Sequence, residues 1–369
     1  MELPLASIVG QVQANCALSD ALYGGVYSLC SLLLRMRDLY KWESGLQPWQ
    51  EPDPPELLEW IESREDSWLS FEKGPFQSIE IDSRSFSPFD VEAINTILRP
   101  QGYVYGAGYG TGMKPTFFLG VLEEQRSVRG LHIDVVGREL ARDLFTSPAM
   151  RQGSHVLTRS RPMESFLWDQ ILEMRPSATD GLVFGLARHG LDLLELRGNP
   201  SSVAPNLGRV ARTELESWIY HEIGEAAQDA FNGHSWHALI STYAGTPVEI
   251  FARVVKDLLA DTHDNGLLGH VIEHRIESTL GFYVAFLRSF TRILFPEIRM
   301  AFSTFRENRN WDRVDEARRQ GYSRALRYAE ALLEIQDEAA EKGTDWGLAQ
   351  IKKQLIEPLG IPMEAPVSS

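Results

Sequence analysis

Apolar residues recur every three or four positions through most of the second half of the chain, which is the spacing of one face of an α-helix. The clearest helix start is the sequence TPVE at residues 246–249, where Thr246 and Glu249 can form a capping box around a proline in the first turn. Apolar residues with helical spacing follow: Val248, Phe251, Ala252, Val255, Leu258 and Leu259. The pattern predicts a helical bundle over residues 181–357 and a loose tail over residues 358–369.

Residues 76–165 carry a different pattern, made of short runs rich in β-branched and aromatic residues. The runs are bounded by glycine, proline or serine, and they are FQSIEIDS, GYVYGAGYG, TFFLGVLEEQ and LHIDVVG. We expect a hairpin around residues 126–130 and helices at residues 138–145 and 163–174. A mixed domain over residues 1–180 follows, so the predicted fold class is α+β, with a small mixed α/β N-terminal domain before a mainly α-helical bundle domain.

The segment before these strands is expected to be helical. A stripe of apolar residues within residues 15–43 predicts a buried helix, and its members are Val26, Leu29, Cys30, Leu33, Leu34 and Met36. Another helix is expected after Asp53, a favoured N-cap, with Pro54 in the first helical position. The only cysteines, Cys16 and Cys30, support neither a disulfide framework nor a cysteine-rich zinc site, so we expect both in the core.

The charge of the chain argues against a general nucleic-acid-binding surface. The formal net charge is −15 at pH 7, and a polyanion would be repelled except by a local basic patch. No apolar run approaches the ~20 residues that cross a bilayer, and the first residues lack the positive charges of a secretory signal. We therefore expect a cytoplasmic protein that does not bind membranes.

Two stretches of opposite charge leave an interaction function open. Residues 299–327 carry eight arginines, whereas residues 41–73 are acidic. The acidic stretch also contains four of the nine tryptophans, Trp42, Trp49, Trp60 and Trp68. The charges can pair between domains or subunits or can be solvated helix faces, and the tryptophans can pack in the core or form a partner surface. A protein partner or a homo-oligomer is therefore an alternative to an enzyme.

Six of the nine histidines lie in a stretch that is also rich in glutamate: His221, His234, His237, His263, His270 and His274. Histidine is the commonest metal ligand and titrates near neutral pH, so this stretch is the strongest indication of chemistry. With about 100° per residue, Glu214, His221 and Glu225 fall within one arc of a helix. A second arc on a later predicted helix contains His270, Glu273, His274 and Glu277.

Two such arcs facing each other would supply ligands for one or two metal ions. Helical di-metal proteins place glutamate and histidine in this way, and iron, manganese or zinc would support oxidative or hydrolytic chemistry. The candidate metal ligands are His221, Glu225, His270, His274 and Glu277, and the candidate catalytic residues are Glu214 and Glu273. Alternatively both arcs face solvent, because each lies opposite a stripe of apolar residues.

Known motifs match only in part. The spacing of Glu214 and His221 resembles that of heme-oxygenase-like di-iron oxidases, whereas the ferritin-like order Glu-x-x-His is reversed at residues 270–273. The sequence HVIEH at residues 270–274 also matches an inverted zinc-protease motif in which Glu273 would activate water, but the downstream glutamate ligand has no compelling counterpart.

The glycine-rich run at residues 106–114 lacks the glycine that a phosphate-binding loop places before its lysine, and we expect a connection with unusual backbone angles.

Several stretches resemble an uncharacterised bacterial protein family of unknown function, and the resemblance runs over most of the chain. These stretches are NCALSDALYGG, RDLYKWE, YHEIGEA, VKDLLADT and LGFYVAFL. The resemblance implies a bacterial cytoplasmic protein and brings no activity with it. Two hypotheses therefore stand: a metal-dependent helical-bundle enzyme, and a non-catalytic interaction or scaffold protein that uses its tryptophan-rich acidic segment or its arginine-rich helices.

Overall fold

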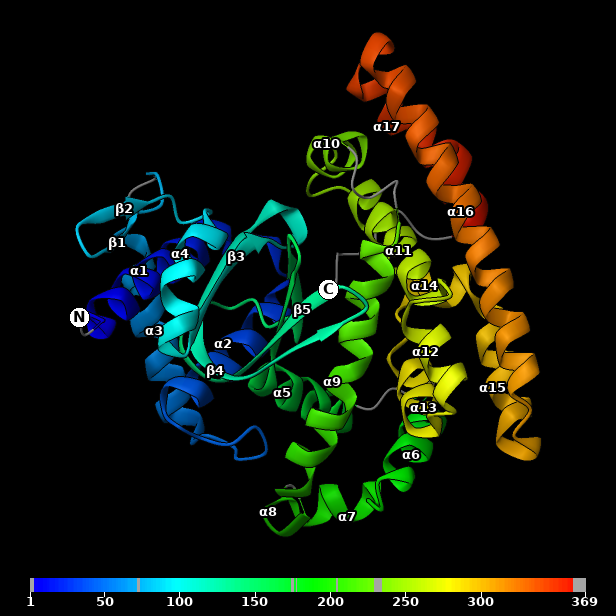
Figure 1. The fold of residues 1–369 in the computed structure, drawn as a ribbon, viewed down its shortest axis with the longest axis horizontal. Coiled ribbons are helices and arrows are strands. Elements are labelled where there is room, and N and C mark those ends of the chain that lie inside the picture. The colour runs from blue at the N-terminus through cyan, green and yellow to red at the C-terminus, as the bar shows by residue number, and fades with distance from the viewer. Residues whose placement is uncertain are drawn as a thin grey trace. The chain divides into compact units, whose positions relative to one another are not determined.

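The computed structural model describes residues 3–71, 74–173, 176, 178–203, 205–228 and 234–360. The chain divides into two compact units. The first comprises Met1–Trp168 and Pro200–Leu215 with Pro366–Ser369, and the second comprises Asp169–Asn199 and Glu216–Ala365. The strands that the structure describes lie in the first unit and the second unit is helical (Figure 1), which confirms the α+β fold class. Residues 361–369 of the predicted tail lie outside the described residues.

A five-stranded sheet with the order β3-β4-β5-β7-β6 forms the centre of the first unit. Its strands are β3 (Tyr103–Tyr109), β4 (Pro115–Val128), β5 (Leu131–Arg142), β6 (Ala149–Gln152) and β7 (His155–Arg159). Neighbouring strands are antiparallel except β5 and β7, which are parallel. The hairpin predicted around residues 126–130 is confirmed, because β4 and β5 are joined at Arg129 and Gly130. Both residues have positive φ, as a type I′ hairpin turn requires.

The first unit also contains helices and one small hairpin. The elements are α1 (Leu5–Tyr23), α2 (Leu29–Glu43), α3 (Pro54–Leu69), β1 (Ile79–Ile81), β2 (Arg84–Phe86), α4 (Val91–Leu98), α5 (Ser160–Leu172) and α8 (Pro200–Val203). Helix α1 packs on β4 and β5, and its residues Ile8, Val12 and Cys16 share an apolar core with the sheet. Helix α3 begins as predicted, with the side chain of Asp53 accepting a hydrogen bond from the backbone N–H of Glu56.

The helix predicted at residues 138–145 is wrong, because most of that segment continues strand β5 as far as Arg142. Glu139 and Arg142 are buried on this strand, and Glu139 forms ion pairs with Arg142 and Arg159. Buried charges interrupt the alternation of apolar and polar residues that would otherwise identify a strand. The apparent helical spacing was therefore a consequence of ion pairs inside the unit.

The buried helix predicted within residues 15–43 is also corrected. The segment forms α1 and α2, separated by a short 3-10 turn at Gly24–Val26, and Ser28 caps α2 by accepting a hydrogen bond from the backbone N–H of Ser31. Met36 is buried as expected, but Leu29 is 72% exposed. Cys16 is buried, whereas Cys30 is exposed and does not belong to the core. The apolar stripe of α2 is thus only partly covered.

A lysine immediately before β4 is buried among carboxylates. Lys114 Nζ lies 3.0 Å from an oxygen of Asp20 and 3.0 Å from an oxygen of Asp143, and it donates to Ser19 Oγ at 2.9 Å. Asp143 also accepts a hydrogen bond from Thr116 Oγ1 at 3.0 Å. One ammonium group therefore compensates two carboxylates in the interior, which makes each member depend on the others.

The second unit is helical, as predicted from its periodicity. Its helices are α6 (Thr179–Arg188), α7 (Leu193–Gly198), α10 (His234–Thr242), α11 (Pro247–Thr262), α12 (Leu267–His274), α13 (Glu277–Phe286), α14 (Ser289–Leu294), α15 (Pro296–Asn308), α16 (Trp311–Lys342) and α17 (Thr344–Ile351). A π-helical turn at Lys352–Ile356 and a 3-10 turn at Glu357–Leu359 follow, and helix α9 (Pro205–Ala226) is shared between the units. Residues of α10 to α17 enclose one apolar core.

Helix α11 begins at Pro247 as predicted, but the expected capping box forms differently. Thr246 makes no side-chain capping bond, and the carboxylate of Glu249 accepts from the backbone N–H of Gly245 at 2.7 Å instead. Glu249 still ties the chain entering α11 to its first turn.

The second predicted arc of histidines and glutamates does not lie on one helix. Helix α12 ends at His274, Arg275 adopts a left-handed conformation with φ 54°, and α13 begins only at Glu277. The N–H of Arg275 donates to the carbonyl of Ile272, and the N–H of Ile276 donates to that of Val271. These are the two hydrogen bonds of a Schellman motif. Because arginine takes the place of the usual glycine, no residue type marks the end of this helix.

The two charged stretches make ion pairs within their own units. Arg306 pairs with Asp180 at 2.8 Å and Arg318 with Asp264 at 2.7 Å, whereas Glu43 of the acidic stretch pairs with Arg64. All four tryptophans of that stretch are half-buried, and Trp60 donates its indole N–H to Glu43 at 3.0 Å. In the part of the chain that the structure describes, no helix is long and apolar enough to cross a bilayer.

Candidate functional site

Two helices of the second unit meet at a glycine. Gly224 of α9 lies against the backbone of α11, where a Cβ on Gly224 would overlap the carbonyl oxygen of Ala260. This close approach brings His221 and Glu225, which are one turn apart on α9, next to Asp257 and Asp261, which are one turn apart on α11. Residues separated by four positions lie on the same helix face, so each helix presents two polar side chains to the other.

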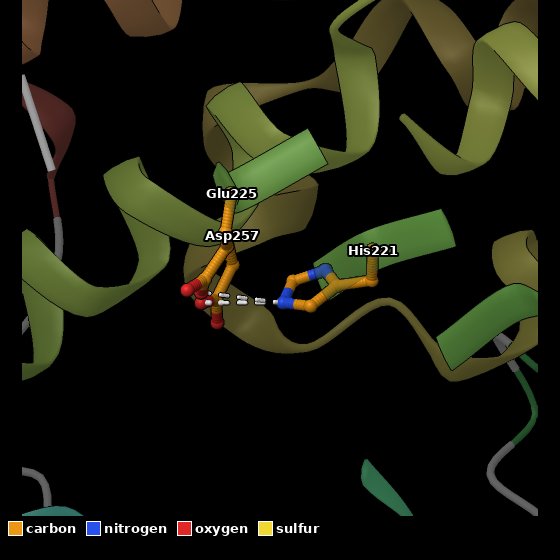
Figure 2. A group of neighbouring side chains, drawn as sticks. All are labelled: His221, Glu225 and Asp257. Atoms are coloured by element: carbon orange, nitrogen blue, oxygen red, sulfur yellow. Dashed lines mark ion pairs between the residues drawn. The ribbon is translucent and has the colours of Figure 1, made fainter. Parts of the chain in front are cut away.

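The imidazole of His221 is surrounded by three carboxylates. Its Nδ1 lies 2.7 Å from Asp261 Oδ1, and its Nε2 lies 3.5 Å from Glu225 Oε1 and 4.0 Å from Asp257 Oδ1. Figure 2 shows the Glu225 and Asp257 carboxylates directed toward the same edge of the ring. The two ring nitrogens therefore have different partners: Asp261 fixes Nδ1, and Nε2 faces the other two carboxylates.

His221, Glu225 and Asp257 form a group that could hold a metal ion. One ligand atom from each residue lies within 4.8 Å of the ligand atoms of the other two. Among the described residues, no other three histidine, cysteine or acidic residues lie this close together. Glu225 is buried, His221 is half-buried and the side chain of Asp257 is 55% exposed. The group is thus walled by protein on one side and open to solvent on the other.

The charges of this group shift its protonation. Burial lowers the pKa of His221, but Asp261, Glu225 and Asp257 outweigh burial and raise that pKa well above its ordinary value. Burial raises the pKa of Glu225, but His221 and Lys256 outweigh it and lower that pKa. Lys256 takes part directly, because its Nζ donates to Glu225 Oε2 at 2.6 Å. Without a bound cation, a protonated imidazole and an ammonium group compensate two of the three carboxylates.

A buried tyrosine faces the same carboxylates. Tyr283 on α13 is 9% exposed, and its hydroxyl lies within hydrogen-bonding reach of Asp261. Burial raises the pKa of Tyr283 well above its ordinary value, and the negative charges of Asp261 and Asp257 raise it further. Tyr283 therefore belongs to the surroundings of the group, where its hydroxyl can donate a hydrogen bond to the Asp261 carboxylate.

The structure brings together only some of the residues that the sequence singled out. His221 and Glu225 belong to the group, whereas Glu214 is buried two turns earlier on α9. The side chain of Glu277 pairs with Arg188 at 2.6 Å and with Arg309 at 3.4 Å. An acid held by two arginines is already fully compensated.

The histidines of α12 form a separate stack. The ring of His270 lies on Tyr220 with centroids 3.5 Å apart, and His274 follows at 4.5 Å. His274 is exposed and lies 3.9 Å from Glu273, which is exposed too. None of these residues joins the metal-compatible group of the described chain. The helix that faces α9 at this group is α11, not the predicted α12.

Sequence reasoning missed Asp257 and Asp261. Both lie in VKDLLADT, a segment whose apolar stripe and family resemblance were considered, but not its acidic residues as partners of His221. The available signal was their spacing, because two aspartates four residues apart lie on one face of a helix, opposite Val255 and Leu259. A search for i, i+4 acid pairs on every predicted helix, and not only on those with histidine, would have found them.

Comparison with known proteins shows the family of the chain without a function. A family model described as the N-terminal domain of a family of unknown function, DUF6866, matches residues 7–159, and the C-terminal domain model of the same family matches residues 164–355. No curated protein and no solved structure matches the chain. The resemblance to an uncharacterised family is therefore confirmed. With both of its domain models matched over most of the sequence, the chain belongs to the DUF6866 family of unknown function.

Proposed function

We propose that the second unit binds one divalent metal ion through His221, Glu225 and Asp257 and uses it to activate water for hydrolysis. The observation that carries this proposal is the convergence of His221 Nε2 with two carboxylates while Nδ1 is held by Asp261. Three protein ligands with an open side are typical of catalytic metal sites, where water takes a remaining position. Zinc and manganese suit hydrolysis, and iron on the same ligands would indicate oxidation.

The distances fit a metal after a small closing movement. Metal–ligand bonds of ~2.1 Å place two ligand atoms ~3.4 Å apart in a tetrahedral site and at most ~4.2 Å apart. The distances from His221 Nε2 to Glu225 and Asp257, 3.5 and 4.0 Å, lie in this range. The limit of 4.8 Å for the whole group is slightly larger, and the exposed Asp257 side chain is free to move inward.

The neighbouring residues have roles that a metal site requires. Asp261 orients His221 and sets which ring nitrogen binds, as outer carboxylates do for metal-ligating histidines. Tyr283 supplies a buried hydroxyl that can donate a hydrogen bond to Asp261, and it thereby helps to hold the carboxylate that orients His221. Lys256 competes with the metal for Glu225 and leaves the site when the ion enters.

Metal content and affinity test this proposal directly. The full chain, purified without a histidine tag and stripped with a chelator, is expected to bind one equivalent of zinc or manganese by equilibrium dialysis and plasma mass spectrometry. His221→Ala and Glu225→Gln should each lower the affinity at least a hundredfold, and Asp261→Asn about 10–100-fold. The control His274→Ala should bind normally, because His274 lies outside the group. Absence of binding, or an equal loss in the control, would refute the site.

Replacing Lys256 with methionine should strengthen zinc binding several-fold, because the variant removes a positive charge bonded to Glu225. The comparison is Lys342→Met, which removes a charge paired with Glu338 at the surface, and whose zinc affinity should not change. Weaker binding in Lys256→Met would show that the lysine holds Glu225 in place for the metal and does not compete with it.

Three inferences from composition stand beside this proposal: a cytoplasmic location, no general affinity for nucleic acid, and a protein partner or self-association. The exposure of Leu29 on α2 supports the last of these, because exposed apolar side chains grouped with other apolar residues are common at interaction surfaces.

A further inference from the structure

Strand β4 of the first unit has a free edge over its last residues. Strand β3 pairs with β4 only from Pro115 to Val121, whereas β5 continues to pair with β4 as far as Val128. Among the residues that the structure describes, no strand pairs with residues 124–128 on the side away from β5. These residues keep a regular register with β5, because the irregularities of the ladder end at Glu124. An unpaired strand edge is a template for pairing with another strand.

The geometry of the hairpin determines which backbone groups lie on this free edge. Val128 and Leu131 flank the two-residue turn, so they exchange both backbone hydrogen bonds with each other. Hydrogen-bonded pairs alternate along an antiparallel ladder, so Arg126 and Glu124 also bond to β5. The N–H and C=O groups of Gln125, which lies between them, therefore point away from β5. Gln125 is exposed, as a residue on a free edge should be.

The charges along the free edge are complementary to themselves. Two antiparallel copies related by a two-fold axis at Gln125 would place Glu124 of each copy opposite Arg126 of the other. These opposite-charge pairs lie at positions without backbone bonds between the copies, where facing side chains are closest. Glu124 and Arg126 lie on one face of β4, with 3.3 Å between Glu124 Oε1 and Arg126 Nε. The Gln125 residues of the two copies would exchange two backbone hydrogen bonds.

The neighbouring registers bring like charges together. A two-fold axis at Glu124 would place two glutamates opposite each other, and an axis at Arg126 would place two arginines opposite each other. Like charges directly opposite each other destabilise a pair of strands. The charges therefore select the register that has its axis at Gln125.

We propose that the free edge is the interface of a homodimer, in which residues 124–128 of two copies pair antiparallel about a two-fold axis at Gln125. The partner is a second copy because the charge sequence of the edge is complementary to itself. A two-fold contact uses both free edges and closes at two copies. The paired segment is short, so the interface is small and the dimer is expected to dissociate on dilution. The interface lies wholly within the first unit and is independent of the function proposed for the second.

Exchange of charges between two variants tests this pairing. Sedimentation velocity of the full chain should show a monomer at low concentration and a reversible dimer as the concentration rises to millimolar. Glu124→Arg and Arg126→Glu should each weaken the dimer at least tenfold, because each alone places like charges opposite each other twice. An equimolar mixture of the two variants should recover the dimer, because each supplies the charge that the other lacks. The control Arg84→Glu, at an exposed position on β2, should leave the dimer unchanged.

Disulfide cross-linking tests the register. In a Cys30→Ser background, which removes the exposed cysteine, Gln125→Cys should form a disulfide between two copies, because residues on the axis have Cα atoms about 5.5 Å apart. Ser127→Cys should not, because its two copies would lie four residues apart along the strands, roughly 13 Å. A chain that stays monomeric to millimolar concentration, or a dimer that the charge variants and their mixture do not change, would overturn the proposal. Cross-linking of Ser127→Cys as readily as Gln125→Cys would overturn it as well.

Discussion

Replacing Lys114 with methionine should lower the free energy of unfolding of the first unit by about 3–5 kcal/mol at pH 7.5, the usual cost of removing one partner of a buried ion pair. Lys114 is 1% exposed, and its ammonium group is the shared partner of Asp20 and Asp143. Methionine has a similar shape but no charge, so two buried carboxylates would remain without their cation. Urea denaturation followed by tryptophan fluorescence measures the loss.

This loss should shrink as the pH falls. Burial raises the pKa of Asp20 to about 6, against the opposing effect of Lys114 and with a further increase from Asp143. A carboxyl whose folded-state pKa is raised contributes stability that is fully present below its unfolded pKa and is lost as the pH rises through the folded value. Without Lys114 the pKa of Asp20 rises further, so the variant should recover much of its stability between pH 7 and pH 5.

Two comparisons make the Lys114 prediction specific. The double variant Lys114→Met with Asp143→Asn should be more stable than Lys114→Met alone, because one of the two uncompensated charges is gone. Lys342→Met, which breaks the surface pair with Glu338, should cost at most about 1 kcal/mol. A loss in Lys114→Met that is independent of pH and not reduced in the double variant would show that packing, not charge, accounts for it.

Local patterns were enough to predict the class of the fold. The helical spacing after residue 181 and the hairpin around residues 126–130 depend on residues close in sequence, and the structure confirms both. The prediction failed at residues 138–142, where the side chains of Glu139 and Arg142 are buried because Arg159 and Asp38, distant in sequence, compensate them. A pattern that assigns charge to the surface cannot anticipate such partners.

The candidate site was predictable on one helix and not between helices. The turn between His221 and Glu225 is a property of α9 alone, and the structure places both in the metal-compatible group. Which helix faces them depends on tertiary packing, and the histidine-rich segment at residues 270–277 was predicted to take that place. That segment ends at a Schellman motif with Arg275 in the left-handed position, whereas α11 approaches α9 because Gly224 has no side chain. Gly224, a glycine inside the helix that carries His221 and Glu225, was the signal that another backbone approaches closely there.

Replacing Gly224 with alanine should destabilise the second unit by about 1–3 kcal/mol, the usual cost of overpacking. The new Cβ would overlap the carbonyl oxygen of Ala260 and lie 2.8 Å from its carbon, and backbone atoms cannot turn aside as a flexible side chain can. The control is Gly10→Ala in α1, where a Cβ meets no atom within 4 Å. That change should stabilise the chain by about 0.5–1 kcal/mol, because alanine is the better helix former.

The same substitution should weaken metal binding through geometry alone. Gly224 is not a ligand, but moving α9 away from α11 lengthens the distances from His221 and Glu225 to Asp257. The distance from His221 Nε2 to Asp257 Oδ1, 4.0 Å, already approaches the upper limit for a shared ion. Dialysis against zinc, at a temperature where Gly224→Ala remains folded by circular dichroism, should show an affinity reduced at least tenfold, with Gly10→Ala unchanged. Undiminished affinity in a folded Gly224→Ala protein would mean that ligands from α9 and α11 do not bind the ion together, because a site that spans two helices depends on the distance between them.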